Sequence, residues 1–366
     1  MKWKIAAAAV CTAALCGCGR FDLLPYAREL DGMALMRTLG VDAAEEGVAV
    51  TASSGTGSGG ENGGGREAEV SGRSAGSISA CVLDMQAEGA SYVYFGHVGQ
   101  LLVGESMAWE RASEPLEYVL RDVEMRLDTQ LYIVKGGSAG EAIRSAAEGS
   151  SAADQLEAMA DGAGMSGWSM PRSVGDVLAD LERCGASFAP ALTVQEGLKM
   201  DGYAILKDGR LAGWAEEDAA EGIHLLTGQA DADVVEVELP DGGKAALRVV
   251  GAQSRTRAVF QGEELKGLQV LCRVDANLAE GDAELRNRET LEELEKRLVE
   301  VETRRIREAL VLGQSLDADF LDLQSAAGIT RPWRWREIQE QWEKWSELEL
   351  NIEVQAHVER SYDAER

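Results

Sequence analysis

The pattern of apolar residues changes near Lys199, and this change constrains the fold more than any other feature of the sequence. Upstream of it, short apolar runs that predict strands alternate with amphipathic stretches that predict helices. The expected strands are Gly47–Ala52, 91–106 in two pieces and Leu131–Gly136, and the expected helices are Ser77–Gly89, Ser113–Leu127, Ala139–Gly164 and Ser173–Cys184. Alternating strands and helices are typical of a mixed α/β domain, which we expect over residues 18–196.

Two turn signals follow the change in pattern. Lys207-Asp208-Gly209 lies between two apolar runs, and Pro240-Asp241-Gly242-Gly243 lies between two more. Turn residues of this kind between alternating apolar runs predict β-hairpins. We expect the two hairpins to form one small antiparallel β domain over residues 197–262.

The last part of the chain combines strands with a long helix. Leu265–Leu278 alternates as a strand does, and Thr290–Leu312 repeats apolar residues every three or four positions. Residues 263–366 are therefore predicted to form a C-terminal α/β domain. The fold class expected for the whole chain is mixed α/β (α+β), with three domains built on mixed and antiparallel sheets, packed helices and the long helix in the C-terminal domain.

The N-terminus has the features of a bacterial lipoprotein signal. Lys2 and Lys4 precede an apolar run from Ile5 to Leu15, which is too short to span a membrane. The run ends in Leu15-Cys16-Gly17-Cys18, which resembles a lipobox, in which the last cysteine receives a diacylglyceryl group. This resemblance predicts that residues 1–17 are a signal peptide and that Cys18 is the lipid-attachment site. An ordinary secretory signal is the alternative.

The charge of the chain excludes some partners. Its formal charge is −27, and removal of residues 1–17, which hold Lys2, Lys4 and no acid, makes it −29. An acidic surface repels phosphates and anionic headgroups. We therefore expect no nucleic-acid partner, and we expect membrane attachment to rest on the lipid rather than on a basic patch.

Three cysteines remain beyond the N-terminal segment, at positions 81, 184 and 272. Such wide spacing indicates neither a disulfide framework nor a metal site. Cys81, Cys184 and Cys272 are predicted to lie in cores as small apolar side chains.

Two glycine motifs could indicate a nucleotide-binding or a catalytic role. Residues 53–65 read SSGTGSGGENGGG, and we expect them to form a flexible loop. Its GxGxxG pattern lacks the helix that a dinucleotide site needs directly afterwards. Ser74 fits GxSxG, but a short charged stretch precedes it rather than a buried strand, so a Ser74 hydrolase is the weaker alternative.

His97, His224 and His357 stand in separate regions, and none has the spacing of a zinc site. We predict no catalytic residue, no metal site and no cofactor, and hence a protein that is not an enzyme.

Tryptophans gather near the C-terminus, in the stretch PWRWREIQEQWEKW at residues 332–345. Trp335, Trp342 and Trp345 fall on one stripe of a helix together with Ile338. Such a stripe is typical of a core, so these three side chains are predicted to be mostly buried and Trp333 to be the exposed exception.

Several weak motifs occur in a fixed order along the chain. They are Gly40-Val41-Asp42, Gly96-His97 with Leu101–Ala108, Leu120-Arg121-Asp122 with Val134-Lys135-Gly136, Gly202–Glu217 and Leu316–Val354. In this order they resemble the Ger(x)C family of spore germination lipoproteins, the C subunits of nutrient germinant receptors. The resemblance covers essentially the whole mature chain.

The resemblance implies a function in spore germination. The protein would be a non-enzymatic receptor subunit, anchored by Cys18 to the outer face of the spore inner membrane. Its partners would be the membrane-embedded A and B type receptor subunits. The resemblance assigns no ligand-binding residue, and the alternative is an extracytoplasmic solute-binding lipoprotein.

Overall fold

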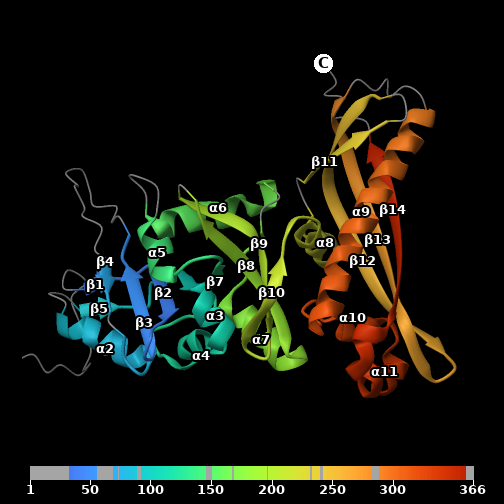
Figure 1. Cartoon of the computed structure of the whole chain (residues 1–366). Coiled ribbons are helices and arrows are strands. Elements are labelled where there is room, and N and C mark those ends of the chain that lie inside the picture. The colour runs from blue at the N-terminus through green and yellow to red at the C-terminus, as the bar shows by residue number, and fades with distance from the viewer. Residues whose placement is uncertain are drawn as a thin grey trace, which may run out of the picture.

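The computed structural model describes residues 33–55, 69–72, 74–88, 92–145, 151–166, 169–195, 197–230, 233–239, 242–281 and 288–359. Cys18 and residues 56–65 of the Gly-rich loop lie outside these ranges. Figure 1 shows two bodies side by side, one around each of two large sheets, with α8 (Glu217–Thr227) between them. Within the described ranges, no helix is long and apolar enough to cross a membrane.

The larger sheet, here called the N-terminal sheet, has eight strands. In order across the sheet they are β10 (Arg210–Ala215), β9 (Leu198–Lys207), β8 (Ala186–Val194), β7 (Gln130–Val134), β6 (Gln100–Val103), β2 (Thr38–Ala43), β3 (Val48–Ser53) and β4 (Glu69–Ser71). The central strands β8, β7, β6 and β2 are parallel to one another, and the outer strands pair antiparallel. The sheet is therefore mixed, as expected.

Helices cover both faces of the N-terminal sheet, because alternate residues of its central strands point to opposite sides. Leu101 and Leu131 belong to a core shared with α2 (Ile78–Glu88), α3 (Glu105–Arg111), α4 (Ser113–Arg121) and α7 (Val174–Cys184). Leu102 and Tyr132 belong to a second core, shared with α5 (Ala139–Arg144) and α6 (Ala152–Ser166). Beside this sheet, β1 (Met33–Leu35) and β5 (Tyr92–Tyr94) form a small parallel pair.

The second large sheet, here called the C-terminal sheet, has four strands. They are β11 (Val234–Glu238), β12 (Lys244–Gln261), β13 (Glu264–Gly281) and β14 (Glu349–Glu359). The long helix α9 (Arg288–Leu316) runs along the sheet (Figure 1) and buries Leu294, Leu298 and Ile306 in their common core. α10 (Leu323–Thr330), the short 3₁₀ helices η2 (Pro332–Arg334) and η3 (Trp342–Glu347) and helix α11 (Trp335–Gln341) connect α9 to β14.

The expectation that both hairpins share one small sheet is wrong. The hairpin around Asp208 is β9–β10, and β9 pairs with β8, so this hairpin extends the N-terminal sheet. The second hairpin, β11–β12, belongs to the C-terminal sheet. The limits drawn after residues 196 and 262 both fall in turns between paired strands, β8–β9 and β12–β13. Local turn signals predict each hairpin, but they do not reveal which strand lies beside it.

The helix expected over Ser113–Leu127 is shorter than predicted. α4 ends at Arg121, where Asp122 takes an extended conformation. Val123 and Leu127 consequently lie beyond the helix, and both are exposed.

Candidate functional site

Several of the segments that carry the resemblance meet at the carboxyl edge of the N-terminal sheet, where the parallel strands β2, β6 and β7 end. The Asp42 carboxylate, near the end of β2, accepts hydrogen bonds from the backbone N–H groups of Ala139 (2.6 Å) and Gly140 (2.9 Å). These donors are the first residues of α5, where helical N–H groups lack partners within the helix. Burial raises the pKa of Asp42, although the two N–H donors oppose this shift.

Glycine is required beside this carboxylate. A Cβ atom on Gly104 would lie 1.9 Å from Asp42 Oδ1, so a larger residue there would displace the carboxylate. The next residue, Glu105, accepts a hydrogen bond from the backbone N–H of Gly136 at 2.9 Å. The sequence Val-Gly-Glu therefore ties β6 to the segment after β7.

Lys135 completes the carboxyl edge. Its Nζ atom donates to Asp201 Oδ2 on β9 at 2.7 Å and also to Glu216 beside the start of α8. The same ammonium lies 5.7 Å from the ring centroid of Trp214 on β10. Glu105, Lys135 and Glu216, which come from three of the motif segments, thus bind one another or each other's neighbours. Through Asp201, Lys135 also connects the outer strand β9 to the centre of the sheet.

Two buried polar clusters lie on α8 and α9, where the two bodies meet. On α8, the His224 ring lies between the Tyr203 hydroxyl (2.7 Å) and Glu221 (3.2 Å). On α9, Glu302 is fully buried and pairs with Arg305, which also binds Asp233. Burial raises the pKa of Glu302 to about 7 against the attraction of Arg305.

Helices α8 and α9, which carry these clusters, pack closely against each other. A Cβ atom on Gly222 of α8 would lie 2.2 Å from the backbone oxygen of Arg305. Arg304 adds an ion pair with Asp218 on α8 at 2.6 Å. α8 therefore anchors α9 to the N-terminal sheet.

The tryptophan prediction is confirmed at most of its positions. Trp342 and Trp345 are 8% and 4% exposed, and their rings stack 6.4 Å apart, whereas Trp333 is 74% exposed. Trp335 is only half-buried, against Gly328. In place of the single expected helix there are three short ones, η2, α11 and η3. The backbone at Lys344 is not helical, so the tryptophans do not follow one regular helical stripe.

Asp319 fixes the position of this aromatic cluster. Its carboxylate accepts hydrogen bonds from Trp342 Nε1 (3.1 Å) and from the backbone N–H groups of Leu323 and Gln324. Burial raises the pKa of Asp319 to about 6. A cavity of about 460 Å³ beside it also exposes Arg183 and Lys207, but Asp322 and Asp317 pair with these cations.

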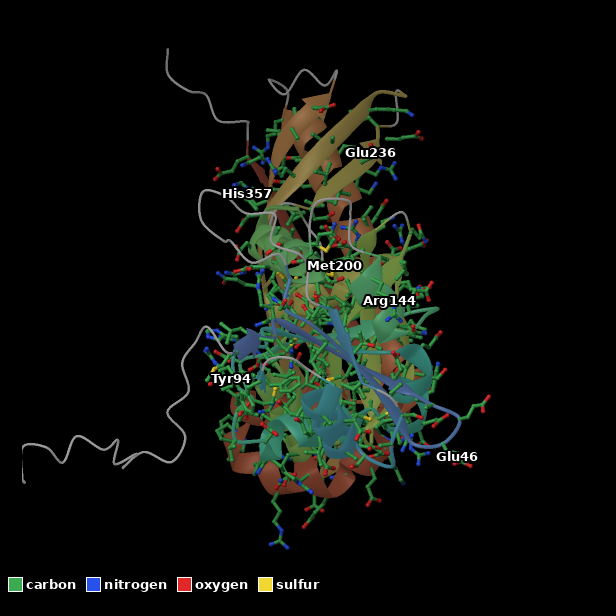
Figure 2. The ribbon with its side chains drawn as sticks, turned by 90° about the vertical axis from the view of Figure 1, so that its left-hand side faces the viewer. Glu46, Tyr94, Arg144, Met200, Glu236 and His357 are labelled. Carbon is green, nitrogen blue, oxygen red and sulfur yellow. The ribbon has the colours of Figure 1, made fainter. Side chains whose placement is uncertain are left out.

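The candidate site residues of the sequence do not come together. Ser74 is exposed before α2, and the neighbouring Ser77 caps that helix by accepting from the Ala80 N–H. Figure 2 shows His357 well separated from Tyr94, whose ring meets His97 edge-on. Cys18, the predicted lipid site, lies outside the described residues.

Within the described ranges, no group of three His, Cys, Asp or Glu side chains could hold a metal ion. Cys81 and Cys272 are buried in the two large cores, which confirms the prediction for these two residues, whereas Cys184 is only half-buried.

Sequence reasoning missed the residues that hold these regions together. Asp42 was named only within the motif Gly40-Val41-Asp42, without a structural role, because its partners are backbone groups distant in sequence. Asp319 was not singled out for a similar reason, and Glu302 with Arg305 has the spacing of an ordinary ion pair on a helix. One signal was present: Asp319 interrupts a short apolar stretch, where a carboxylate requires buried hydrogen-bond donors.

Comparisons with known proteins agree with this architecture. Residues 26–194 match the family described as "Spore germination protein N-terminal domain", and residues 201–362 match "Spore germination B3/ GerAC like, C-terminal". A solved structure titled "Crystal Structure of the GerBC protein" aligns with a TM-score of 0.59 at 16% identity, over 87% of this chain and 96% of that chain. At this identity the likeness shows the fold. None of the curated proteins matches the chain.

The two family matches follow each other in chain order and leave out residues 1–25, 195–200 and 363–366. They include the motif segments that meet at the carboxyl edge and the tryptophan cluster. The family supplies components of germinant receptors, which work with other receptor subunits at the spore membrane. The chain therefore belongs to the GerAC-like family of spore germination proteins and is a component of a germinant receptor.

Proposed function

We propose that the chain is a lipid-anchored, non-enzymatic subunit of a spore nutrient-germinant receptor. The observation that carries this proposal is the pair of family matches in consecutive order over nearly the whole chain. The polar clusters described above support a structural role, because their carboxylates and cations bind one another.

The proposed anchor is Cys18, which would hold the protein at the outer face of the spore inner membrane. Two acyl chains give stable attachment, whereas a single chain is marginal. The lipobox-like sequence Leu15-Cys16-Gly17-Cys18 supports this site, and the net charge of −27 argues against electrostatic attachment to anionic lipids. The proposed partners are the membrane-embedded A and B type receptor subunits.

The test replaces the anchoring thiol. Cys18→Ala should move the protein from the spore membrane fraction to the soluble fraction and should impair germination with nutrients. Cys16→Ala is the matched control, because it changes a thiol two residues away and leaves Cys18 in place. Normal fractionation and germination of Cys18→Ala spores would sink the proposal.

Co-purification of the A and B type subunits with the wild-type chain from solubilised spore membranes tests the proposed partners.

A further inference from the structure

The C-terminal sheet has one face against α9 (Figure 1), and its other face is exposed. Alternate residues of a strand point to opposite faces of its sheet. Cys272, Val274 and Val354 belong to the core beneath α9. Residues between them, such as Arg273 and Glu353, are exposed and point to the opposite side, here called the outer face.

Arginines form a row on one side of the outer face. They are Arg248, Arg255 and Arg257 on β12 and Arg273 on the neighbouring strand β13. Within the described ranges, none of the four has an ion-pair or hydrogen-bond partner. In a chain with a net charge of −27, these guanidinium groups therefore offer positive charge to a group outside the chain.

Glutamates form a second row, on the other side of the outer face. They are Glu349, Glu353 and Glu359 on β14, and all three are exposed. Glu353 accepts a hydrogen bond from the amide of Gln355 at 3.1 Å, which is uncharged and leaves its negative charge in place. Since β13 lies between the two rows, they are about 10 Å apart.

The strand register places opposite charges at the same level of the two rows. Arg255 pairs with Leu271 on β13, and Leu271 pairs with Glu353 on β14. A two-fold axis along β13 would place the β12 row of one copy over the β14 row of a second copy. Each Arg255 would then face Glu353 of the other copy, so the outer face is complementary to itself.

The same axis matches the levels on either side. Asn277 lies between Arg248 and Glu359 in register, so these two charges would also face each other. Arg257 is level with Asn351, so its guanidinium would lie between Glu349 and Glu353 of the second copy.

The central strand supplies the contacts on the axis itself. Leu271 is half-buried and would meet Leu271 of the second copy, and Val259 on β12 is 40% exposed and adds apolar surface. Arg273 would meet its own copy, but Asp275, two residues further on, brings a carboxylate beside each guanidinium. Sheets that pack face to face keep their strand directions within about 30°, which preserves the contacts at the centre.

The glutamate row argues against other occupants. Anionic headgroups of a membrane would attract the arginines, but Glu349 and Glu353 would repel them. An acidic segment of another protein would meet the same repulsion. A second copy of this chain matches both rows at once.

We propose that the outer face binds a second copy of this chain in a two-fold dimer, in which Arg255 of each copy pairs with Glu353 of the other. Eleven residues of β14 beside β13 and β12 give roughly 500 Å² per copy, less than the about 800 Å² of a standard interface, so the dimer is weak. The proposal concerns this chain alone and does not rest on the proposed function.

The first experiment is cross-linking of the full-length chain, purified in detergent with micelles in large excess over protein. Leu271→Cys puts a thiol on the axis, and a short bismaleimide should convert this variant into a covalent dimer. Val311→Cys is the matched control, because it puts a thiol on an exposed position of α9. It should give no more dimer than the wild type, and equal yields from Leu271→Cys and Val311→Cys would overturn the proposal.

Charge reversal then tests the paired residues. Added to Leu271→Cys, either Arg255→Glu or Glu353→Arg brings like charges together at two places in the dimer. The yield of cross-linked dimer should fall by about tenfold or more. Arg210→Glu is the control, because it reverses an exposed arginine on β10, and it should leave the yield unchanged.

A mixture of the two reversed chains gives the sharpest result. Each reversed residue then meets an opposite charge on the other chain, so the yield should return, which a misfolded variant cannot achieve. A mixture that stays monomeric, or an undiminished yield from Arg255→Glu, would overturn the proposal. The wild-type pairs are exposed to solvent, so about 0.5 M salt should reduce the yield of Leu271→Cys dimer.

Vesicles containing phosphatidylglycerol test the membrane as occupant. The wild-type chain should bind them no better than Arg255→Glu does. Binding that Arg255→Glu abolishes, together with the absence of a dimer, would assign the outer face to the lipid surface and overturn the proposal.

Discussion

The carboxyl and amino edges of the N-terminal sheet differ in how their polar groups are satisfied. At the carboxyl edge, Asp42, Glu105 and Lys135 all bind groups of the same chain. At the amino edge, Gln130 and Tyr132 each have a buried polar atom without a hydrogen-bond partner among the described residues, beside a cavity. Ligands of open α/β sheets usually bind outside the carboxyl ends of the strands. In this molecule that edge is used for assembly of the fold, and the hollow lies at the opposite edge.

The largest expected effect comes from breaking the carboxyl edge. Asp42→Ala removes the acceptor of two N–H groups at the start of α5, which would leave buried donors unpaired. We expect a loss of about 3 kcal/mol in the free energy of unfolding. Urea denaturation of the purified protein measures it, and Asp42→Asn, which keeps one acceptor oxygen, should lose less. An Asp42→Ala variant as stable as the wild type would show that this edge is not held by the carboxylate.

A second prediction concerns Glu302, which is buried like Asp42 but has a cation, Arg305, as its partner. Its pKa is raised from 4.5 to about 7 in the folded state, so folding favours the protonated form. The stabilisation from this proton is complete below pH 4.5 and is lost as the pH rises to about 7, with an effect of about 2–3 kcal/mol.

The measurement is the free energy of unfolding at a series of pH values from 4.5 to 7.5. Glu302→Gln cannot lose a proton, so its stability should fall less steeply with pH than that of the wild type. The slope of the unfolding free energy against pH is compared between the wild type and Glu302→Gln. The contribution of Asp319 cancels in this comparison, because both proteins contain Asp319. Parallel slopes would mean that Glu302 is ionised throughout and that its pair with Arg305 outweighs burial.

The smallest expected effect lies at the amino edge. Tyr132→Phe removes a buried hydroxyl that has no partner within the described part of the chain, so the variant should be as stable as the wild type or about 1 kcal/mol more stable. Thermal unfolding in plain buffer measures this difference. A clear loss of stability would show that the hydroxyl has a partner in solution, and the contrast between the two edges would then disappear.

Much of the local structure could be predicted from the sequence. The hairpin around Asp208, the helix from Ser173 and the burial of Trp342 follow from turn residues, capping and helical spacing. These signals act within a few residues. The pairing of β9 with β8 instead of with the second hairpin depends on contacts that no local pattern encodes.

The polar sites show the same limit. Asp42 finds its partner 97 residues away, which neither its type nor its neighbours indicate. Tyr132 lies in the apolar stretch Leu131-Tyr132-Ile133-Val134, so its sequence context predicts an ordinary core residue. That its hydroxyl has no partner emerges only from the packing of α6 over the strands.

The pairing of β8 with β9 has a consequence for how the chain is made. The first family match ends at residue 194 and the second begins at residue 201, so the boundary between them falls inside the N-terminal sheet. When the first part of the chain emerges during synthesis, β8 presents a free edge, which can pair with the wrong partner. Residues 198–215 close that edge as they follow. The two family segments therefore share the N-terminal sheet, and a cut between them would separate β9 and β10 from the strands that they complete.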